Sequence, residues 1–298
     1  LTKEFSSVFQ PPKEPAQLPA VRLDTIDPAL FPPVKHRRMS PKVRDAVKEQ
    51  IDTLLNLNVI EPSHSRTVSN IVPVKKANGS IRLCVDYTKI NKHVTKKPFA
   101  QLDVYNSISQ IKNAKYLAAL DLYSGFFQLS LAESCRSQYS FLTPWGVFEP
   151  TRLCQGARNS TALFHPIIVD TFKSIKNVIV YVDDLLIHAD TKEEYIATLR
   201  AVFERCREVH LTLNRKKCIF NACALDVLGF TISSNGFTVG RVRHARRQLL
   251  ARHMLCYAML LPRRIDLEGA SGERVGLGPS RARTAVAPRP IACHSIRT

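Results

Sequence analysis

The sequence has no apolar run long enough to cross a bilayer. The longest such run near its end, MLCYAMLL, has eight residues, whereas a membrane-spanning helix needs about 20. The first residues also lack the pattern of a secretory signal peptide. These absences predict a soluble protein that has no membrane partner.

Cysteine patterns for metal binding or disulfide pairing are missing too. The eight cysteines include no CxxC pair and no cluster with histidine at zinc spacing. Isolated cysteines of this kind are typical of reduced thiols in a cytosol-like compartment. We therefore expect a cytoplasmic protein without a disulfide framework.

Acidic residues are scarce relative to basic ones. The 298 residues include 25 Asp and Glu against 43 Lys and Arg, which gives a formal net charge of +18. Half of this excess lies in residues 240–298, a stretch that contains no lysine. A charge of this size favours a polyanionic partner, above all nucleic acid, with an anionic membrane surface as the alternative.

Composition and periodicity separate the first residues from the rest of the chain. Residues 1–39 hold seven of the 18 prolines, which predicts an extended linker that wraps on or leads into a domain. From residue 40 apolar side chains recur at helical spacing, with Ser40 as N-cap and Pro41 at the first helical position. A helix that ends near Asn58 is expected.

Two β-rich runs come next and meet at Asn78 and Gly79. This dipeptide is the strongest short-range signal for a β-hairpin. The tip of the predicted hairpin is basic, with Lys75, Lys76 and Arg82. Such a cluster could hold phosphate, although a solvated basic face is the more common explanation.

Residues 115–239 follow one order of elements. The predicted elements are a strand at 115–121, a helix at 159–173 interrupted by Pro166, a hairpin at 177–188, a helix behind the capping box of Thr191 and Glu194, and a last strand. Strand, helix, two strands, helix, strand is the split βαββαβ order of ferredoxin-like folds. The fold class expected is therefore α+β.

Three carboxylates should converge in this topology. The end of the first strand lies beside the central hairpin, so Asp121 would approach Asp183 and Asp184, which lie at or near the hairpin tip. An oxygen-rich pocket suits Mg²⁺, and a bound cation would offset the cost of two adjacent carboxylates in an apolar run. The alternative is ordinary turn chemistry, because Asp is common at hairpin tips.

Several motifs in fixed order resemble the reverse transcriptases of gypsy-type LTR retrotransposons. LDLYSGFFQ and YVDD with the following LLIHADTKEE resemble the palm motifs of that family. IEPSHSRTVSNIVPVKKANGSIRLCVDYTKIN, FLTPWGVFEPTRLCQGARNS and VLGFTIS follow the same order, within residues 35–239, and EFSSVF resembles the segment that joins protease to polymerase. The resemblance implies a right-hand polymerase with fingers at 40–115, partly interleaved with a palm at 116–239.

The resemblance also implies a catalytic set. Asp121, Asp183 and Asp184 match the catalytic carboxylates, which with the carbonyl of Leu122 would hold two Mg²⁺ ions, for which Mn²⁺ can substitute. Lys217 matches a lysine near the departing pyrophosphate and would act as a general acid.

Further matches concern the nucleotide and the primer. The residues matched to nucleotide binding are Lys75, Arg82, Phe126, Gln155 and Gly156. Phe126 takes the position whose ring excludes a ribose 2′-hydroxyl, although a core aromatic is the plain alternative. The residues matched to the primer grip are Leu228, Gly229 and Phe230.

The function expected from the resemblance is RNA-directed DNA synthesis. The partners would be an RNA or DNA template with its primer and a deoxynucleoside triphosphate, in the cytoplasm or in a virus-like particle. Three alternatives stay open: an inactive remnant that only binds nucleic acid, an RNA-packaging protein, and an RNA-dependent RNA polymerase, which Phe126 opposes.

Some positions depart from the family pattern. Thr88 replaces a usual Arg, Cys154 a common Pro, and Thr161 a frequent Pro. Residues 240–298 match none of the thumb, connection or RNase H segments that the family carries next. We expect this Arg-rich tail to be aberrant and mostly disordered, with the thumb absent or replaced.

Overall fold

The computed structural model describes residues 1–31, 34–35, 37–75, 79–98, 111, 114–227, 230–233 and 236–239. All of them belong to one unit of the chain, Leu1–Leu261. The predicted tail at 240–298 and the predicted residues Lys76, Asn78, Leu228 and Gly229 lie outside the described residues. Across the described ranges, the structure contains no helix with the length and apolarity needed to span a membrane.

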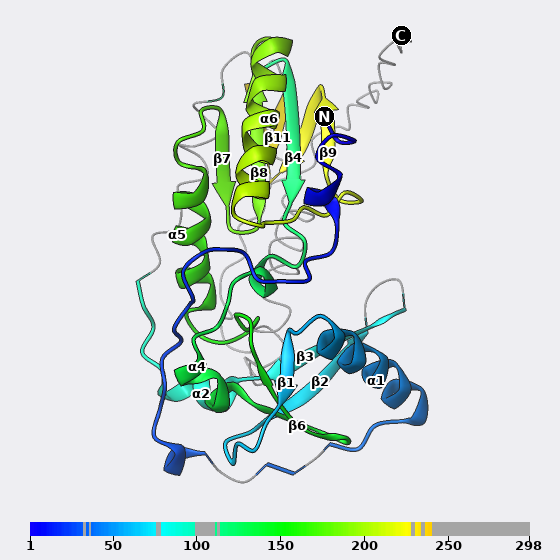
Figure 1. The fold of residues 1–298 in the computed structure, drawn as a ribbon, viewed down its shortest axis with the longest axis vertical. Coiled ribbons are helices and arrows are strands. Elements are labelled where there is room, and N and C mark those ends of the chain that lie inside the picture. The colour runs from blue at the N-terminus through cyan, green and yellow to red at the C-terminus, as the bar shows by residue number, and fades with distance from the viewer. Residues whose placement is uncertain are drawn as a thin grey trace, which may run out of the picture. The chain divides into compact units, whose positions relative to one another are not determined.

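A four-stranded antiparallel sheet carries the predicted βαββαβ order (Figure 1). Its strands, in spatial order, are β7 (Val178–Tyr181), β8 (Asp184–Ala189), β4 (Tyr116–Asp121) and β9 (Ile219–Ala222). Helices α5 (Ser160–Phe172) and α6 (Lys192–Glu208) cover one face of this sheet. Because β4 is central and antiparallel to both neighbours, the ferredoxin-like topology expected from the sequence is confirmed.

Helix α6 forms as its sequence pattern predicts. The hydroxyl of Thr191 accepts a hydrogen bond from the Glu194 N–H at 3.3 Å, which caps the first turn. The buried apolar residues recur at helical spacing and are Tyr195, Leu199, Val202, Phe203 and Cys206. This stripe packs into the same core as Leu120 and Leu185 of the sheet.

Helix α5 differs from the prediction at Pro166. The sequence predicted an interruption there, but the helix runs unbroken from Ser160 to Phe172 with Pro166 inside it. Proline removes one backbone donor, and the buried side chains of Phe164, His165 and Ile168 on both sides of it hold the helix against the sheet. Tertiary packing therefore outweighs the local preference.

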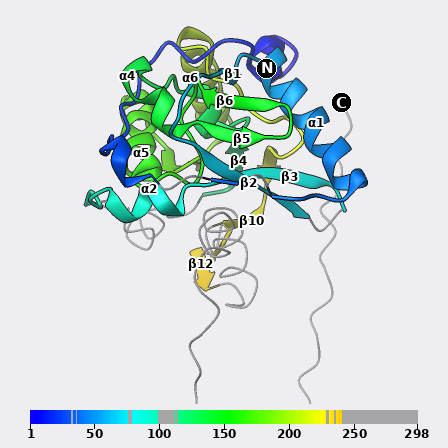
Figure 2. The same cartoon turned by 90° about the horizontal axis from the view of Figure 1, so that it is seen from below.

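A second sheet has five strands (Figure 2). Its strands, in spatial order, are β1 (Ile60–Pro62), β6 (Gly146–Pro150), β5 (Phe141–Thr143), β2 (Ser69–Lys75) and β3 (Ile81–Asp86). Helix α1 (Pro41–Asn56), predicted from its periodicity, packs Val47 and Ile51 into the core of this sheet. Strands β5 and β6 come from beyond β4 in the chain, so the two sheets interleave in sequence.

The predicted hairpin and two short helices complete the region of the five-stranded sheet. Strands β2 and β3 pair in register from Asn70↔Asp86 to Lys75↔Ile81. Gly79 follows with φ +81°, a left-handed conformation that glycine adopts without steric cost. Helix α2 (Thr88–His93) continues from β3, and α4 (Glu133–Arg136) precedes β5.

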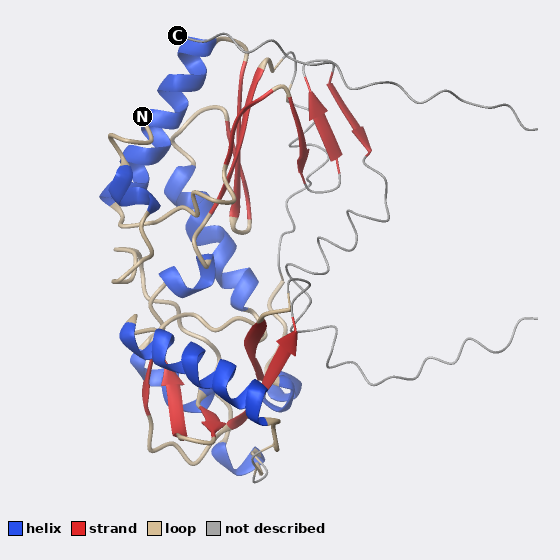
Figure 3. Ribbon diagram, turned by 90° about the vertical axis from the view of Figure 1, so that its right-hand side faces the viewer, coloured by secondary structure: helices blue, strands red, loops and turns tan. Residues whose placement is uncertain are grey.

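A three-stranded antiparallel sheet lies on the other face of the four-stranded sheet (Figure 3). It comprises β10 (Ala224–Val227), β11 (Phe230–Ser233) and β12 (Gly236–Val239). Leu225 and Ile232 share a hydrophobic cluster with Leu117 of β4 and Leu186 of β8. The alternation of β4 and β8 thus supplies a core on each face of their sheet.

The proline-rich N-terminal segment packs onto the sheet and helices. Phe5 and Val8, in and next to a 3₁₀ helix at Ser6–Phe9, are buried against Phe203 and its neighbours. The Leu213 N–H donates to the Val8 carbonyl at 2.7 Å, and Val21 forms a bridge with Leu131. A second 3₁₀ helix, Pro28–Leu30, follows. The segment is extended and wraps on the domain as an integral part of its core.

Candidate active site

The sheet register places two of the predicted carboxylates opposite each other. Asp121 ends β4 and pairs directly with Asp184, the first residue of β8. Asp183 lies in the turn just before it, and its carbonyl accepts a hydrogen bond from the Leu122 N–H at 3.0 Å. The three carboxylates therefore occupy one end of the sheet, as the topology predicted.

The turn between β7 and β8 contains a strained residue. Tyr181 pairs with Asp184, so Val182 and Asp183 form a two-residue loop. Val182 has φ +53°, a left-handed conformation that costs a residue with a Cβ about 1–2 kcal/mol and is rarer still for β-branched side chains. Strain of this kind persists only where the surroundings enforce it.

Lys217 contacts the carboxylate of Asp121. Its Nζ lies 3.0 Å from Oδ1 and 3.2 Å from Oδ2 of Asp121, which is 4% exposed. Two main-chain hydrogen bonds hold residues 214–217, the segment that carries Lys217. The Asn214 N–H donates to the Asp121 carbonyl, and the Lys217 N–H donates to the Asn214 carbonyl. The buried negative charge of Asp121 thus has a cationic partner.

The chemical type of the donor atoms at this end of the sheet suits a hard divalent cation. Carboxylate and carbonyl oxygens are the ligands that Mg²⁺ prefers, and Asp121, Asp183, Asp184 and Leu122 supply them from two adjacent strands and their turn. Within the described ranges, no three His, Cys, Asp or Glu side chains are already arranged around one ion position. A cation at Asp121 would compete with Lys217.

Gly125 allows close packing behind the carboxylate turn. It begins a 3₁₀ helix, Gly125–Gln128, and a Cβ built there would lie 3.2 Å from the Asp183 Cβ and 3.2 Å from the Phe164 Cζ. Both distances are shorter than ordinary van der Waals contact. A larger residue here would require Asp183 or Phe164 to shift by a few tenths of an ångström.

Gly125→Ala should lower the free energy of unfolding by about 1–2 kcal/mol, because the added methyl overpacks a closed site. Urea unfolding measures the change. Phe164→Leu makes room on one side, so in that background the same substitution should cost less. An equal cost in both backgrounds would contradict the steric explanation.

Phe126 is buried beside this turn. Its side chain is 7% exposed and stacks on Phe164 of α5, with ring centroids 4.6 Å apart and an interplanar angle of 19°. The ring therefore has a rigid aromatic wall behind it. Both sequence interpretations, a wall against the sugar and a core aromatic, are compatible with this position.

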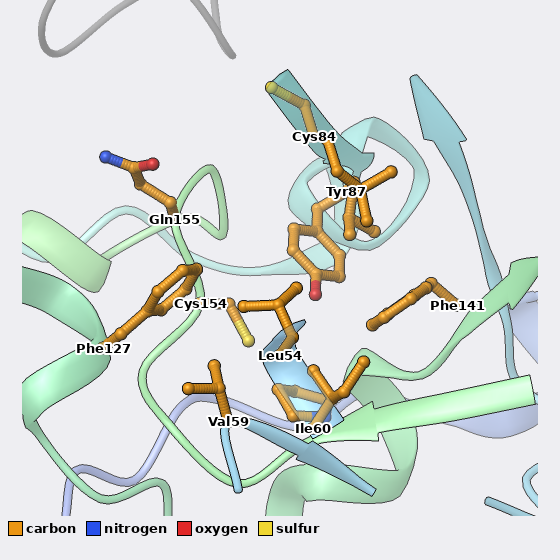
Figure 4. A pocket seen from close by; sticks show the side chains of 12 residues that line it. Leu54, Val59, Ile60, Cys84, Tyr87, Phe127, Phe141, Cys154 and Gln155 are labelled. Atoms are coloured by element: carbon orange, nitrogen blue, oxygen red, sulfur yellow. The ribbon is translucent and has the colours of Figure 1, made fainter. Parts of the chain in front are cut away.

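Gln155 and Gly156 form a turn that α2 supports. Gly156 has φ +92°, and its carbonyl accepts a hydrogen bond from the Asn91 Nδ2 at 3.0 Å. Gln155 lies at the edge of an apolar cavity of about 60 Å³ (Figure 4). The side chains that line this cavity include those of Phe127 and Cys154. The Gln155 amide points away from both of them.

The two predicted phosphate-binding residues of the hairpin do not share a face. Lys75 pairs with Ile81, whereas Arg82 pairs with Val74, and directly paired residues lie on the same face of a pleated sheet. Ile81 packs toward α1, so Arg82 projects from the face away from α1. The side chain of Lys75 therefore leaves the sheet on the face toward α1, at the end of β2.

Of the predicted primer grip only Phe230 is described. It begins β11, pairs with Val239, and its ring lies 5.8 Å from that of Phe237. Leu228 and Gly229 remain predictions.

Two buried polar residues that the sequence did not single out support the site. Gln128, fully buried, donates from Nε2 to the carbonyls of Tyr123 and Thr212 at 2.9 Å and accepts from the Thr212 N–H at 2.7 Å. His165 accepts from the Val182 N–H through Nδ1 at 3.2 Å. The sequence feature that could have identified both residues is a polar side chain within an apolar motif.

Comparison with known proteins agrees with this geometry. Residues 74–232 match the family described as reverse transcriptase (RNA-dependent DNA polymerase). The chain is 31% identical over 248 residues to the retrovirus-related Pol polyprotein from transposon opus of Drosophila melanogaster, which covers 79% of this chain and 24% of that protein. The transposon Tf2-3 polyprotein of Schizosaccharomyces pombe is 26% identical over 208 residues, 69% of this chain and 16% of that protein. The chain thus spans a quarter or less of these relatives.

A solved structure shares the fold. The foamy viral protease-reverse transcriptase in complex with double-stranded DNA superposes with a TM-score of 0.74 at 25% sequence identity, over 83% of this chain and 44% of that one. The same kind of protein with an RNA/DNA hybrid gives a TM-score of 0.68 at 24% identity, over 83% of this chain and 34% of that one.

Proposed function

The chain belongs to the reverse transcriptase family, and on this premise we propose that it forms the fingers and palm of an RNA-directed DNA polymerase from a gypsy-type LTR retrotransposon. The fingers comprise residues 40–115 together with β5 and β6, and the remainder of 116–239 is the palm. The observation that carries the proposal is the pairing of Asp121 with Asp184, next to Asp183 in its strained turn.

The reaction is transfer of a nucleotidyl group from a deoxynucleoside triphosphate to a primer 3′-hydroxyl. Asp121, Asp183, Asp184 and the Leu122 carbonyl are the groups that would hold divalent ions, two Mg²⁺ or Mn²⁺. When bound, such ions supply positive charge where the primer hydroxyl loses its proton and the pyrophosphate leaves. The carboxylates fix where that charge lies.

In this proposal Lys217 holds a proton beside the reacting phosphates. Its Nζ is 3.0 Å from Asp121 Oδ1, and its side chain is 54% exposed, so it can leave Asp121 and donate to the departing pyrophosphate. Arg82, Lys75, Gln155 and Gly156 bind the triphosphate and base, and Arg provides two parallel donors for phosphate oxygens. Leu228, Gly229 and Phe230 hold the primer.

The nucleic-acid partner is a primer paired to an RNA or DNA template. The foamy viral proteins of similar fold bind double-stranded DNA and an RNA/DNA hybrid, and the net charge of +18 suits a polyanion. Synthesis would take place in the cytoplasm or in a virus-like particle. Extension of oligo(dT) on poly(rA) with Mg²⁺ and dTTP tests the activity, and binding without extension would leave only the nucleic-acid-binding remnant.

Binding of the chain to a poly(rA)/oligo(dT) duplex should weaken as salt rises. Each phosphate neutralised by Lys or Arg releases condensed counterions, so log K should fall linearly with log[salt], by a slope of roughly −0.9 per phosphate on a duplex. Fluorescence anisotropy across a series of salt concentrations measures this slope. An affinity that stays flat would show that the basic residues do not bind the backbone.

A further inference from the structure

The strained turn of Val182 and Asp183 is held from a different element. His165 lies on α5, is 5% exposed, and its Nδ1 accepts the hydrogen bond from the Val182 N–H at 3.2 Å. This bond fixes the main chain of Val182, whose φ of +53° is left-handed. The contact connects two segments that lie 17 positions apart.

The bond requires a neutral imidazole. A main-chain N–H can donate only to an unprotonated Nδ1, so the proton of the ring is on Nε2. Burial lowers the pKa of His165, which favours this neutral form. The environment of α5 therefore keeps the acceptor available.

Helix α5 also supports the other side of the site. Phe164, the neighbour of His165, stacks on Phe126 and limits the space at Gly125, which in turn lies against Asp183. Consecutive residues of one helix thus contact the segment that follows Asp121 and the turn that carries Asp183.

We propose that His165 is a positioning residue, whose Nδ1 holds Val182 in its left-handed conformation and thereby fixes Asp183 and Asp184 for nucleotidyl transfer. This inference rests on the proposed polymerase function. Without the acceptor, Val182 would relax toward an unstrained φ, and the direction in which the two carboxylates point would change.

Two substitutions separate positioning from filling of the core. His165→Leu places an apolar side chain of similar size at the site but has no acceptor, whereas His165→Asn places Oδ1 near the position of Nδ1. In the Leu variant kcat should fall about fivefold with KM for dTTP nearly unchanged, the loss that one hydrogen bond of ordinary strength implies. The Asn variant should recover most of kcat. If His165 only fills space, Leu should be tolerated at least as well as Asn.

The Val182→Gly chain is the background in which His165→Leu is compared, because position 182 is then free of strain. Glycine adopts positive φ without steric cost, so in that background His165→Leu should lower kcat by less than about twofold, because nothing remains for the hydrogen bond to enforce. The same fivefold loss in both backgrounds would overturn the proposal. Should the Leu variant not fold, His165→Ala, which also lacks an acceptor, replaces it in the comparison with Asn.

Amide hydrogen exchange tests the contact without any activity. The Val182 amide should be protected in the unchanged chain and in the Asn variant, and should exchange about tenfold faster in the Leu variant. Equal exchange in all three would refute the positioning role. If the unchanged chain shows this protection yet extends no primer, the proposed function fails and the contact stands.

Discussion

Asp183→Asn is expected to abolish primer extension while leaving template binding and the free energy of unfolding nearly unchanged. Asn has the shape of Asp, and the main-chain carbonyl that accepts the Leu122 N–H at 3.0 Å is unaffected. The substitution removes one negative charge from the proposed ion-binding group, so charge stabilisation in the transition state is lost. Single-turnover extension should slow by at least roughly 10³-fold.

Asp170→Asn is the matched control. It makes the same chemical change on α5 at a side chain that is 68% exposed and pairs with Lys173 at the surface, an interaction of small energy. Extension by this variant should equal that of the unchanged chain. Near-normal extension by Asp183→Asn would remove Asp183 from the catalytic set.

Phe126→Ala should raise ribonucleotide incorporation relative to deoxyribonucleotide incorporation by at least about tenfold. In the proposed site the ring lies under the incoming sugar, where a 2′-hydroxyl would meet it. Phe164 stacks behind it at 4.6 Å, so the ring cannot retreat, and steric exclusion by a packed wall exceeds what a missing methylene gives. The ratio of kcat/KM for dGTP and GTP on one template measures the effect.

The same substitution will also destabilise the fold. Phe126 is 7% exposed within the main core, and its truncation should cost about 3–5 kcal/mol. Phe127→Ala removes the same atoms one position along, at the wall of the 60 Å³ cavity, and should lower Tm without changing the choice of sugar. A Phe126→Ala chain that melts early yet keeps its preference would show that the ring is only a core aromatic.

Periodicity and turn chemistry were enough to predict the elements that carry the carboxylates. The strand at 115–121, the hairpin at 177–188 and the capped, apolar-striped helix α6 were predicted from local signals, and the βαββαβ order that they form then brought Asp121 next to Asp184. The predicted interruption at Pro166 was wrong, because burial of Phe164 and Ile168 against the sheet is a tertiary effect that no local preference contains.

The supporting contacts needed the folded chain. The pair of Lys217 and Asp121 joins residues 96 positions apart, and only the family resemblance placed that lysine near the site. The hydrogen bond of His165 to Val182 depends on how α5 crosses the sheet. The pleat likewise decides that Lys75 and Arg82 start from opposite faces, which their shared basic character does not reveal.

The buried N-terminal segment has a consequence for the order in which this chain can fold. Arg200 binds Glu4 across 196 positions, and Leu213 binds Val8. During synthesis residues 5–8 emerge well before α6, but the surface they cover exists only after α6 and the segment behind it have been made. Closing so large a loop costs entropy before any contact compensates for it, so the earliest residues of this domain should be among the last to reach their native position.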